Sequence, residues 1–429
     1  HDDGGLPRTG AAAAAREAGA AAQAFGLTIT AERIGIAADG DAGRLYAVQA
    51  LRQLLRPAED ADRESDHESA SGVTLPCGSV EDWPDLPDRG YMLDISRNRV
   101  PTRETLDELL DLLLLLRYNH LELYLEHTFA YAQHQEVWEG WSPMTPEDVR
   151  RLDREAAARG IELVPNQNSF GHMTRWLEHE SYRHLAETPD GFTDPWGGHR
   201  DYPFSLAPVA AGVEEFLAGL YDELLPCFRS RRFHVGLDET FDLGQGRSAE
   251  AIAAEAGRRG AAASADAESA RGRIYLDFLK RIHAMVDARN HRMLFWADII
   301  QNHPDLVPEL PEGVPAVEWG YDADHDFDTR CRRLADAGVE FMVAPGTSLW
   351  NSVGGRYNVA KVNIRRAVDA ALRFGGRGML LTDWGDNGHI PPPVLADPAI
   401  ALAGAHSWNA AAALPDGPAP SPESSAFGW

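Results

Sequence analysis

The stretch Arg232-Phe-His-Val-Gly-Leu-Asp-Glu-Thr240 is an apolar run that ends in two adjacent carboxylates, Asp238 and Glu239. Burying charge is costly, so two acids at the end of a buried strand indicate chemistry. In a barrel enzyme the carboxyl ends of the strands carry the active site. Adjacent residues of a strand point to opposite sides, so we expect the two acids to have different roles.

Seven further segments have the same strand character, and helical segments separate them. The helix that precedes Glu162 begins at Thr145-Pro-Glu-Asp148, an N-cap followed by proline and acids, and ends at Gly160. Repeated β/α units predict a (β/α)8 TIM barrel. A doubly wound open sheet is less favoured, because no glycine-rich phosphate loop follows a strand. The candidate strands are Gly90–Ser96, His120–Tyr124, Glu162–Asn166, Arg232–Leu237, Met293–Trp296, Ala316–Trp319, Glu340–Ala344 and Gly378–Thr382.

A small α/β domain is expected before the barrel. Residues Phe25–Ala37 alternate in part like short strands, and Leu45–Leu55 has helical spacing. We place this domain at residues 1–75, the barrel at 76–412 and a tail at 413–429. The acidic segment Ala58–Gly72 predicts an exposed loop, and the Ala/Gly-rich segment Asp242–Arg273 an irregular excursion.

Composition argues against several classes of protein. The 429 residues hold 40 basic and 66 acidic side chains, a net charge of −26, which disfavours binding to nucleic acid or to anionic membranes. Cys77, Cys227 and Cys331 form neither a disulfide framework nor a zinc pattern. No run of eighteen apolar residues predicts a membrane span. The chain begins at His1, so its localisation stays open, with a cytoplasmic one slightly favoured over a secreted one.

Tryptophans, carboxylates and amides gather at the expected strand ends. Pyranose rings stack on indoles through their C–H faces, and their hydroxyls need paired acceptors, so this set indicates a carbohydrate site. No metal or cofactor is implied, since the histidines lack zinc-ligand spacing; of these, His172 is expected in the site. The further candidates are Asn168, Trp296, Asp298, Glu318, Trp319, Tyr321, Trp350, Trp384 and Asp386.

Glycoside hydrolysis usually needs a proton donor and a second group that acts at the anomeric carbon. Two acids adjacent in sequence cannot flank one glycosidic bond in both roles. If the substrate carries a 2-acetamido group, its carbonyl oxygen can act as the nucleophile while one acid orients that amide. The pair therefore favours substrate-assisted hydrolysis.

These motifs resemble glycoside hydrolase family 20, the β-N-acetylhexosaminidases, over about Gly26 to Asn409. His234-Val-Gly-Leu-Asp-Glu239 is similar to the family's His-x-Gly-Gly-Asp-Glu signature, and Arg89-Gly-Tyr-Met-Leu-Asp-Ile-Ser-Arg97 to its first barrel strand. Leu380-Leu-Thr-Asp-Trp-Gly-Asp-Asn-Gly-His389 looks nearer to the divergent hexosaminidase D-like branch.

The resemblance implies a role for each matching position. It implies Glu239 as the acid/base, Asp238 as the residue that orients the acetamide, and Arg89 as a ligand of sugar hydroxyls. Trp296, Trp319 and Trp384 would be aromatic walls, and Asp386 would bind ring hydroxyls. The expected substrate is a small molecule, oligosaccharide or glycoconjugate with a terminal β-linked GlcNAc or GalNAc, and a homodimer is left open.

Three positions depart from the family pattern. Asn168 stands where an aspartate usually supports the histidine and acid network. Leu237 replaces the second glycine of the signature. The tyrosine that usually binds the acetamide carbonyl has two candidate positions, Tyr321 and Trp350.

Two other functions remain as alternatives. In the first, Glu239 is the acid and Glu318 a covalent nucleophile on ordinary β-glycosides. In the second, the barrel binds sugar without turning it over.

Overall fold

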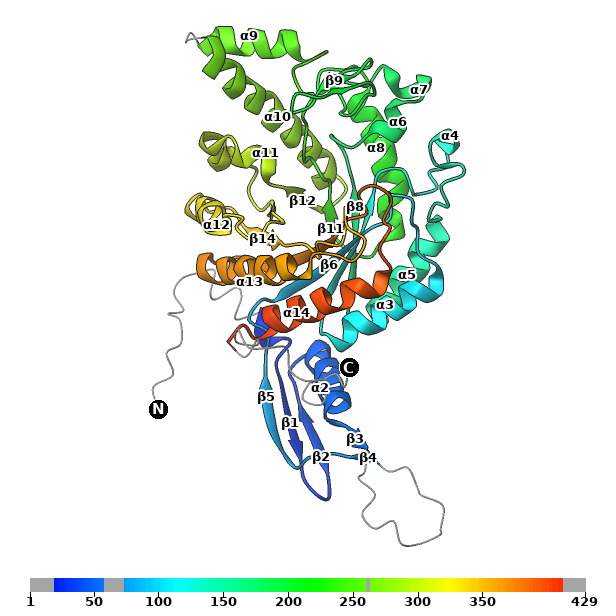
Figure 1. The fold of residues 1–429 in the computed structure, drawn as a ribbon, viewed down its shortest axis with the longest axis vertical. Helices are drawn as coiled ribbons and strands as arrows, with labels where there is room; N and C mark the ends of the chain where they lie inside the picture. Colours follow the sequence, from blue (N-terminus) through cyan, green and yellow to red (C-terminus); the bar gives the residue numbers. More distant parts are fainter. Residues whose placement is uncertain (1–18, 58–72, 260–262, 412–429) are drawn as a thin grey trace.

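The computed structural model describes residues 19–57, 73–259 and 263–411. It contains a closed barrel of parallel strands surrounded by helices, with a small α/β domain at one end of it (Figure 1). The predicted fold class is therefore confirmed. The predicted loop Ala58–Gly72 and the tail at 413–429 lie outside the described residues.

Eight strands form the barrel, and each of them overlaps a predicted segment. The last strand pairs with the first and closes the ring. Their bounds are β6 Asp88–Asp94, β7 His120–Leu125, β8 Glu162–Gln167, β11 Arg232–His234, β12 Arg292–Trp296, β13 Ala316–Trp319, β14 Phe341–Ala344 and β15 Gly378–Asp383.

Among the described residues, seven longer helices pack around the strands, and shorter ones lie in the connecting loops. The predicted start of α5 is confirmed, because Thr145 and Asp148 form a reciprocal capping box with proline in the first turn. The long helices are α3 Arg103–Leu115, α5 Pro146–Ala158, α8 Val213–Leu224, α10 Ala263–Asp287, α12 Phe327–Asp336, α13 Tyr357–Phe374 and α14 Asp397–Trp408. The short ones in the described chain are α4 Gln135–Trp138, α6 Thr174–Leu177, α7 Glu180–Arg183 and α11 Asp298–Gln301.

The prediction of an irregular excursion at Asp242–Arg273 is wrong for most of that segment. Helix α9, Ala249–Arg259, and the start of α10 occupy it and pack against each other. Alanine has the highest helix propensity, so the alanines that suggested irregularity instead favour helix.

The small domain consists of a three-stranded antiparallel sheet and helix α2, Asp41–Leu54. Strand β1, Phe25–Ile29, lies between β2, Ile34–Ala37, and β5, Gly78–Asp82, and a two-residue pair, β3 Arg56–Pro57 with β4 Val73–Thr74, lies beside them. Because β5 pairs with β1, the predicted boundary at residues 75 and 76 is too early, and this domain extends to Asp82.

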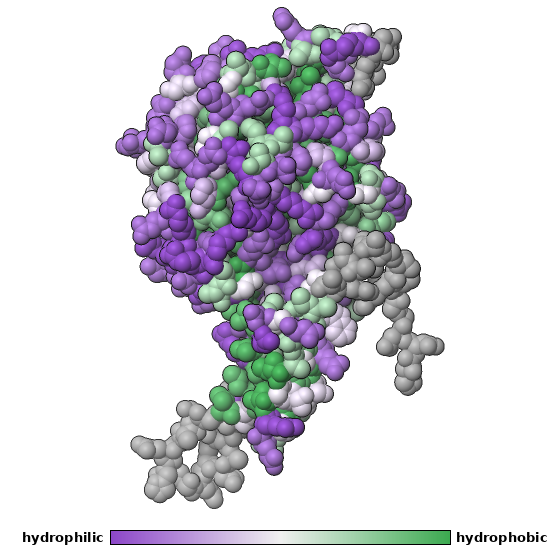
Figure 2. Space-filling model, turned by 180° about the vertical axis from the view of Figure 1, so that it is seen from behind, coloured by the Kyte–Doolittle hydropathy of each residue, from purple (hydrophilic) through white to green (hydrophobic). Residues whose placement is uncertain are grey.

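Hydrophobic side chains are unevenly distributed over the surface. Figure 2 shows a mainly hydrophilic barrel in that view, whereas hydrophobic residues gather toward the small domain. There Ile34 and Ile36 of β2 are exposed. Among the described helices, none is long and apolar enough to cross a membrane.

Arg89 joins the small domain to the amino end of the barrel. Its fully buried guanidinium donates to Gln23 Oε1 at 2.8 Å and to Tyr46 Oη at 3.2 Å, both from the small domain. Further hydrogen bonds reach three backbone carbonyl groups of the barrel. The Trp408 ring at the end of α14 lies 4.9 Å from the Arg89 guanidinium carbon and 5.2 Å from the Tyr46 ring. One charged side chain thus satisfies acceptors from both parts of the molecule.

Inside the barrel, a polar layer lies below the carboxyl ends of the strands. His120 Nε2 is 2.8 Å from Glu122 Oε1, and Asn166 Nδ2 donates to Glu122 Oε2 at 2.7 Å. All three side chains are fully buried. Burial raises the pKa of Glu122 to about 8 and lowers that of His120 well below its ordinary value. At neutral pH both groups are therefore uncharged.

Arg89→Met should lower the free energy of unfolding by about 3 kcal/mol, because it leaves buried acceptors without a donor. Urea denaturation measures this change. The control Arg103→Met removes an exposed arginine that pairs with Asp148 and should alter stability little. Equal stability of the two variants would show that Arg89 does not hold the domains together.

Glu122→Gln should flatten the dependence of stability on pH. Because the pKa of Glu122 is about 8 in the folded state and near 4.5 when unfolded, the folded protein binds more protons between these values. The contribution is thus present at low pH and is lost as pH rises through about 8. Glutamine preserves the neutral hydrogen bonds, so the variant should lose less stability between pH 5 and 8.5 than the wild type. The exposed control Glu147→Gln should follow the wild type; a Glu122→Gln profile that does so too would contradict the assignment.

Candidate active site

The two acids follow a sharp turn at the end of β11. Gly236, Leu237 and Glu239 have φ values of +74°, +77° and +51°, which strand pairing does not allow. A Cβ on Gly236 would lie 1.8 Å from Asn168 Oδ1, so only glycine fits there. The strand therefore ends at His234, whereas the sequence predicted that it would extend to Leu237. Because of this turn, the expectation that the acids point to opposite sides is wrong.

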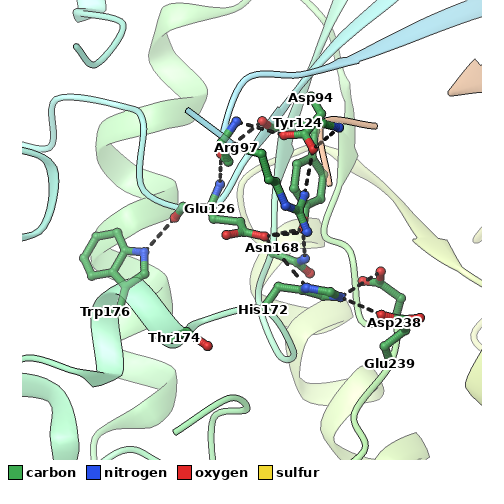
Figure 3. A network of polar contacts seen from close by, with 12 residues as sticks. Asp94, Arg97, Tyr124, Glu126, Asn168, His172, Thr174, Trp176, Asp238 and Glu239 are labelled. Atoms are coloured by element: carbon green, nitrogen blue, oxygen red, sulfur yellow. Dashed lines mark hydrogen bonds and ion pairs between the residues drawn. The ribbon is translucent and has the colours of Figure 1, made fainter. Parts of the chain in front are cut away.

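His172 brings both acids together. Its Nε2 lies 3.3 Å from Asp238 Oδ2 and 3.4 Å from Glu239 Oε2, and its Nδ1 lies 3.8 Å from Glu126 Oε1 (Figure 3). Burial alone would lower the pKa of His172, but Asp238 and Glu239 outweigh it and raise that pKa well above its ordinary value. The contacts with these two acids therefore favour the protonated, cationic form of His172.

Asp238 is the complementary anion. Burial would raise its pKa, yet the charge of His172 and the contact with it lower the pKa below the ordinary value for aspartate. The Asp238 side chain is 7% exposed and that of Glu239 is 32% exposed, so Glu239 is the more accessible of the two. The pair thus consists of a fixed buried carboxylate and a carboxyl group that can reach a ligand.

A directed chain of hydrogen bonds supports His172 from β7 and β8. Asn168 Nδ2 donates to Tyr124 Oη at 2.8 Å, and Tyr124 Oη donates to Glu126 Oε1 at 3.0 Å (Figure 3). Burial and the nearby Glu126 hold the pKa of Tyr124 well above its ordinary value, so the hydroxyl keeps its proton. Glu126 thus provides the carboxylate that faces His172, whereas Asn168 acts as a donor.

Arg97 is the second cation of the site. Its guanidinium contacts Asp94 Oδ2 at 2.9 Å and Glu126 Oε1 at 3.0 Å, and its carbon lies 4.9 Å from the Tyr124 ring. Asp386 is half-buried; burial raises its pKa, while the charge of Arg97 favours its ionised form. Arg97 and Asp386 therefore form a polar edge of the site.

Asp298 lies next to the two acids. Its Oδ2 accepts a hydrogen bond from the Glu239 backbone N–H at 3.0 Å. Burial and the negative charge of Asp238 raise the pKa of Asp298 well above its ordinary value. A neutral Asp298 adds a hydrogen-bonding group without adding another negative charge.

Aromatic rings line the space beside these acids. Trp319 stacks on Tyr321 with ring centroids 5.2 Å apart, and Trp384 Nε1 donates to Tyr321 Oη at 2.7 Å. Trp350 contacts the Tyr321 ring edge-on at 5.0 Å. Trp296 has no exposed surface and belongs to the core below, so it forms a floor and not the predicted wall.

Two predicted residues lie elsewhere. Arg89 is at the amino end of β6 with its donors bound to the small domain, so the expectation that it contacts sugar hydroxyls is wrong. Glu318 lies on the helix-facing side of β13, where it pairs with Arg330 of α12 and accepts from Gln301 Nε2 at 3.2 Å. It therefore faces away from the interior and cannot serve as the nucleophile of the first alternative.

The candidate site residues chosen from the sequence did not include Glu126, Arg97 and Tyr124. All three lie at or just after the carboxyl ends of β6 and β7, and this position in the sequence could have identified them. Arg97 is the last residue of the motif in which Arg89 was chosen as the ligand of sugar hydroxyls. In that motif Arg89 precedes the strand core and Arg97 follows it, and only the second position reaches the site.

Known proteins resemble this chain in sequence and in fold. The sequence model for the glycosyl hydrolase family 20 catalytic domain matches residues 87–361, and that for domain 2 of the family matches residues 3–83. Human hexosaminidase D is 25% identical over 232 residues, 53% of this chain and 43% of the relative. Lacto-N-biosidase of Bifidobacterium bifidum is 24% identical over 355 residues, 82% of this chain and 28% of the relative.

A solved structure shows the same fold at low sequence identity. The family 20 exo-β-N-acetylglucosaminidase of Vibrio harveyi, in complex with N-acetylglucosamine, gives a TM-score of 0.68 at 19% identity and covers 90% of this chain and 63% of that one. The chain spans less than half the length of the two sequence relatives. Since the catalytic-domain match extends over more than half of the chain and includes the Asp238–Glu239 pair, the protein belongs to glycosyl hydrolase family 20.

Proposed function

We propose that this protein is a retaining exo-β-N-acetylhexosaminidase that removes terminal β-linked GlcNAc or GalNAc by substrate-assisted catalysis. The observation that carries the proposal is the His172 contact with both Asp238 and Glu239, which gives one buried anion and one accessible acid. The family membership supports the reaction class. Ionised Asp238 suits an amide N–H, and Glu239 suits the glycosidic oxygen.

In the first step, the acetamide carbonyl oxygen attacks C1 while the bond from C1 to the leaving oxygen breaks. Glu239 gives its proton to that oxygen, and the product is an oxazolinium ion. Asp238 Oδ1 has no hydrogen-bond partner among the described residues, so it can accept the acetamide N–H and stabilise the developing positive charge. Glu239 then takes a proton from water, which attacks C1 and reopens the ring with retention.

The surrounding residues hold the sugar. Tyr321 Oη accepts from Trp384, so its own proton can be donated to the acetamide carbonyl. Trp319 and Trp384 offer faces for C–H stacking. In this proposal Arg97 and Asp386 bind ring hydroxyls; the resemblance implied that role for Asp386 and for Arg89, and Arg97 replaces Arg89 in it.

Glycosides with and without the 2-acetamido group test the proposal. Nitrophenyl β-GlcNAc or β-GalNAc should be cleaved at least about a hundredfold faster than the glucoside and galactoside, because those lack the internal nucleophile. A thiazoline analogue of the intermediate should inhibit competitively. Equal rates with all four glycosides would overturn the mechanism.

Glu239→Gln and Asp238→Asn should each lower kcat by at least about a hundredfold, since one removes the proton donor and the other the charge opposite the oxazolinium. Steady-state kinetics measures both. Glu318→Gln is the matched control, because it alters a buried glutamate on the other side of β13, and it should retain turnover. Equal rates for the wild type and Glu239→Gln would instead favour a sugar-binding barrel without catalysis.

Asn168→Asp should lower kcat by about tenfold and not improve it. An aspartate there would accept from Tyr124 Oη and compete for the proton now donated to Glu126. It would also add a negative charge near Glu126 and Asp238. The pH profile of kcat, measured beside thermal stability, separates this effect from unfolding. A stable variant with wild-type or higher kcat would contradict the proposed direction of the chain.

A further inference from the structure

A row of aromatic side chains leads outward from the candidate active site. The ring centroids of His172 and Phe204 are 4.9 Å apart, and Phe204 is followed by Phe241 at 6.0 Å with an interplanar angle of 8°. Trp196 contacts Phe241 at 5.8 Å and ends the row. We call Phe204, Phe241 and Trp196 the aromatic row.

The aromatic row starts beside the acid. Phe241 follows Glu239 by two residues, and its backbone N–H donates to the Glu239 carbonyl oxygen at 2.6 Å. Trp196 lies in a hairpin formed by β9, Phe192–Thr193, and β10, His199–Arg200. Figure 1 shows β9 above β8 and β11 in that view, and the contact between Trp196 and Phe241 brings the hairpin to the loop after β11.

The hairpin is held by specific hydrogen bonds. Asp194 Oδ1 accepts from the backbone N–H groups of Trp196 at 3.0 Å and Gly198 at 2.7 Å, and Arg200 pairs with Asp194 Oδ2 at 2.7 Å. Gln245 Nε2 donates to the carbonyl oxygens of Thr193 at 2.9 Å and of Phe241 at 3.0 Å. The turn therefore has a defined conformation and is tied to the loop that carries Phe241.

Within this ordered turn the Trp196 side chain is 78% exposed. Exposing a large aromatic surface forfeits hydrophobic stabilisation, so an exposed indole on an ordered turn, at the end of a row of rings that starts in the site, suggests a binding role. The half-buried rings of Phe204 and Phe241 continue the row inward to His172. A pyranose ring can stack on such surfaces through its C–H face.

We propose that Trp196 and Phe241 form a subsite for the leaving group, and that this subsite binds the sugar ring next to the bond being cleaved. This inference rests on the proposed function, in which Glu239 protonates the oxygen of the leaving group. Phe241 follows Glu239 in the loop after β11 and hydrogen-bonds to its carbonyl oxygen. We therefore expect the Phe241 ring to face the leaving group. The preferred substrate is accordingly a β-linked oligosaccharide and not a glycoside with a small aglycone.

The test compares substrates that share the terminal sugar and differ in the leaving group. The probes are the β-1,4-linked trisaccharide of GlcNAc and methyl β-GlcNAc, and the measured quantity is the ratio of their kcat/KM values. In Trp196→Ala this ratio should fall about tenfold relative to the wild type, since the loss of one stacking contact acts chiefly on the trisaccharide. Trp196→Phe should recover much of the ratio.

Trp83→Ala is the matched control, because Trp83 is another exposed tryptophan, 47% exposed, just after β5 of the small domain. It should leave the ratio at the wild-type value. An unchanged ratio in Trp196→Ala would overturn the subsite, and if size-exclusion chromatography then showed a changed oligomeric state, Trp196 would belong to an interface between copies of the chain. A wild type that cleaves neither probe, nor any nitrophenyl N-acetylhexosaminide, would overturn the proposed function itself.

Discussion

The charge of His172 is the constraint on which the rest of the site depends. Asp238, Glu239 and Glu126 all approach this one imidazole, and three carboxyl groups in a buried space would otherwise repel one another. A cationic His172 allows Asp238 to stay ionised despite its burial. Burial and the charge of Asp238 raise the pKa of the neighbouring Asp298, which favours its neutral form and lessens the same repulsion. The site thus balances its charge locally, although the whole chain carries a large negative excess.

The direction of the hydrogen bonds explains why an amide can stand at position 168. The Asn168 side chain accepts from the Leu237 backbone N–H at 3.3 Å and donates to Tyr124, so one amide serves two partners of opposite polarity. A carboxylate could only accept. A further carboxyl group beside His172 comes from the neighbouring strand β7, where Glu126 Oε1 lies 3.8 Å from His172 Nδ1. The departure from the family pattern is therefore compensated within the barrel and does not remove support for the histidine.

The sequence allowed the barrel strands to be predicted because buried parallel strands are continuous apolar runs with readable ends. It also placed Asp238, Glu239 and His172 correctly near one another. What it could not predict depends on backbone geometry and side-chain direction. The positive φ at Leu237, a residue that rarely adopts such values, turns both acids toward His172. Asp242–Arg273 was misjudged because its alanines and glycines suggested irregular structure, although alanine favours helix and two helices pack against each other there.

Arg89 and Arg97 differ in their contacts because they lie at opposite ends of the barrel. In such barrels the amino ends of the strands contribute to stability and the carboxyl ends carry the active site. Both arginines belong to one short motif, but Arg89 lies near the start of the seven-residue strand β6 and Arg97 lies after its end. At the amino end, Arg89 meets carbonyl groups and the small domain, so it contributes to stability. At the carboxyl end, Arg97 pairs with Asp94 and Glu126, so its charge lies beside the candidate active site. The motif alone does not distinguish these two sets of contacts. The position of each arginine relative to the start and the end of the strand does.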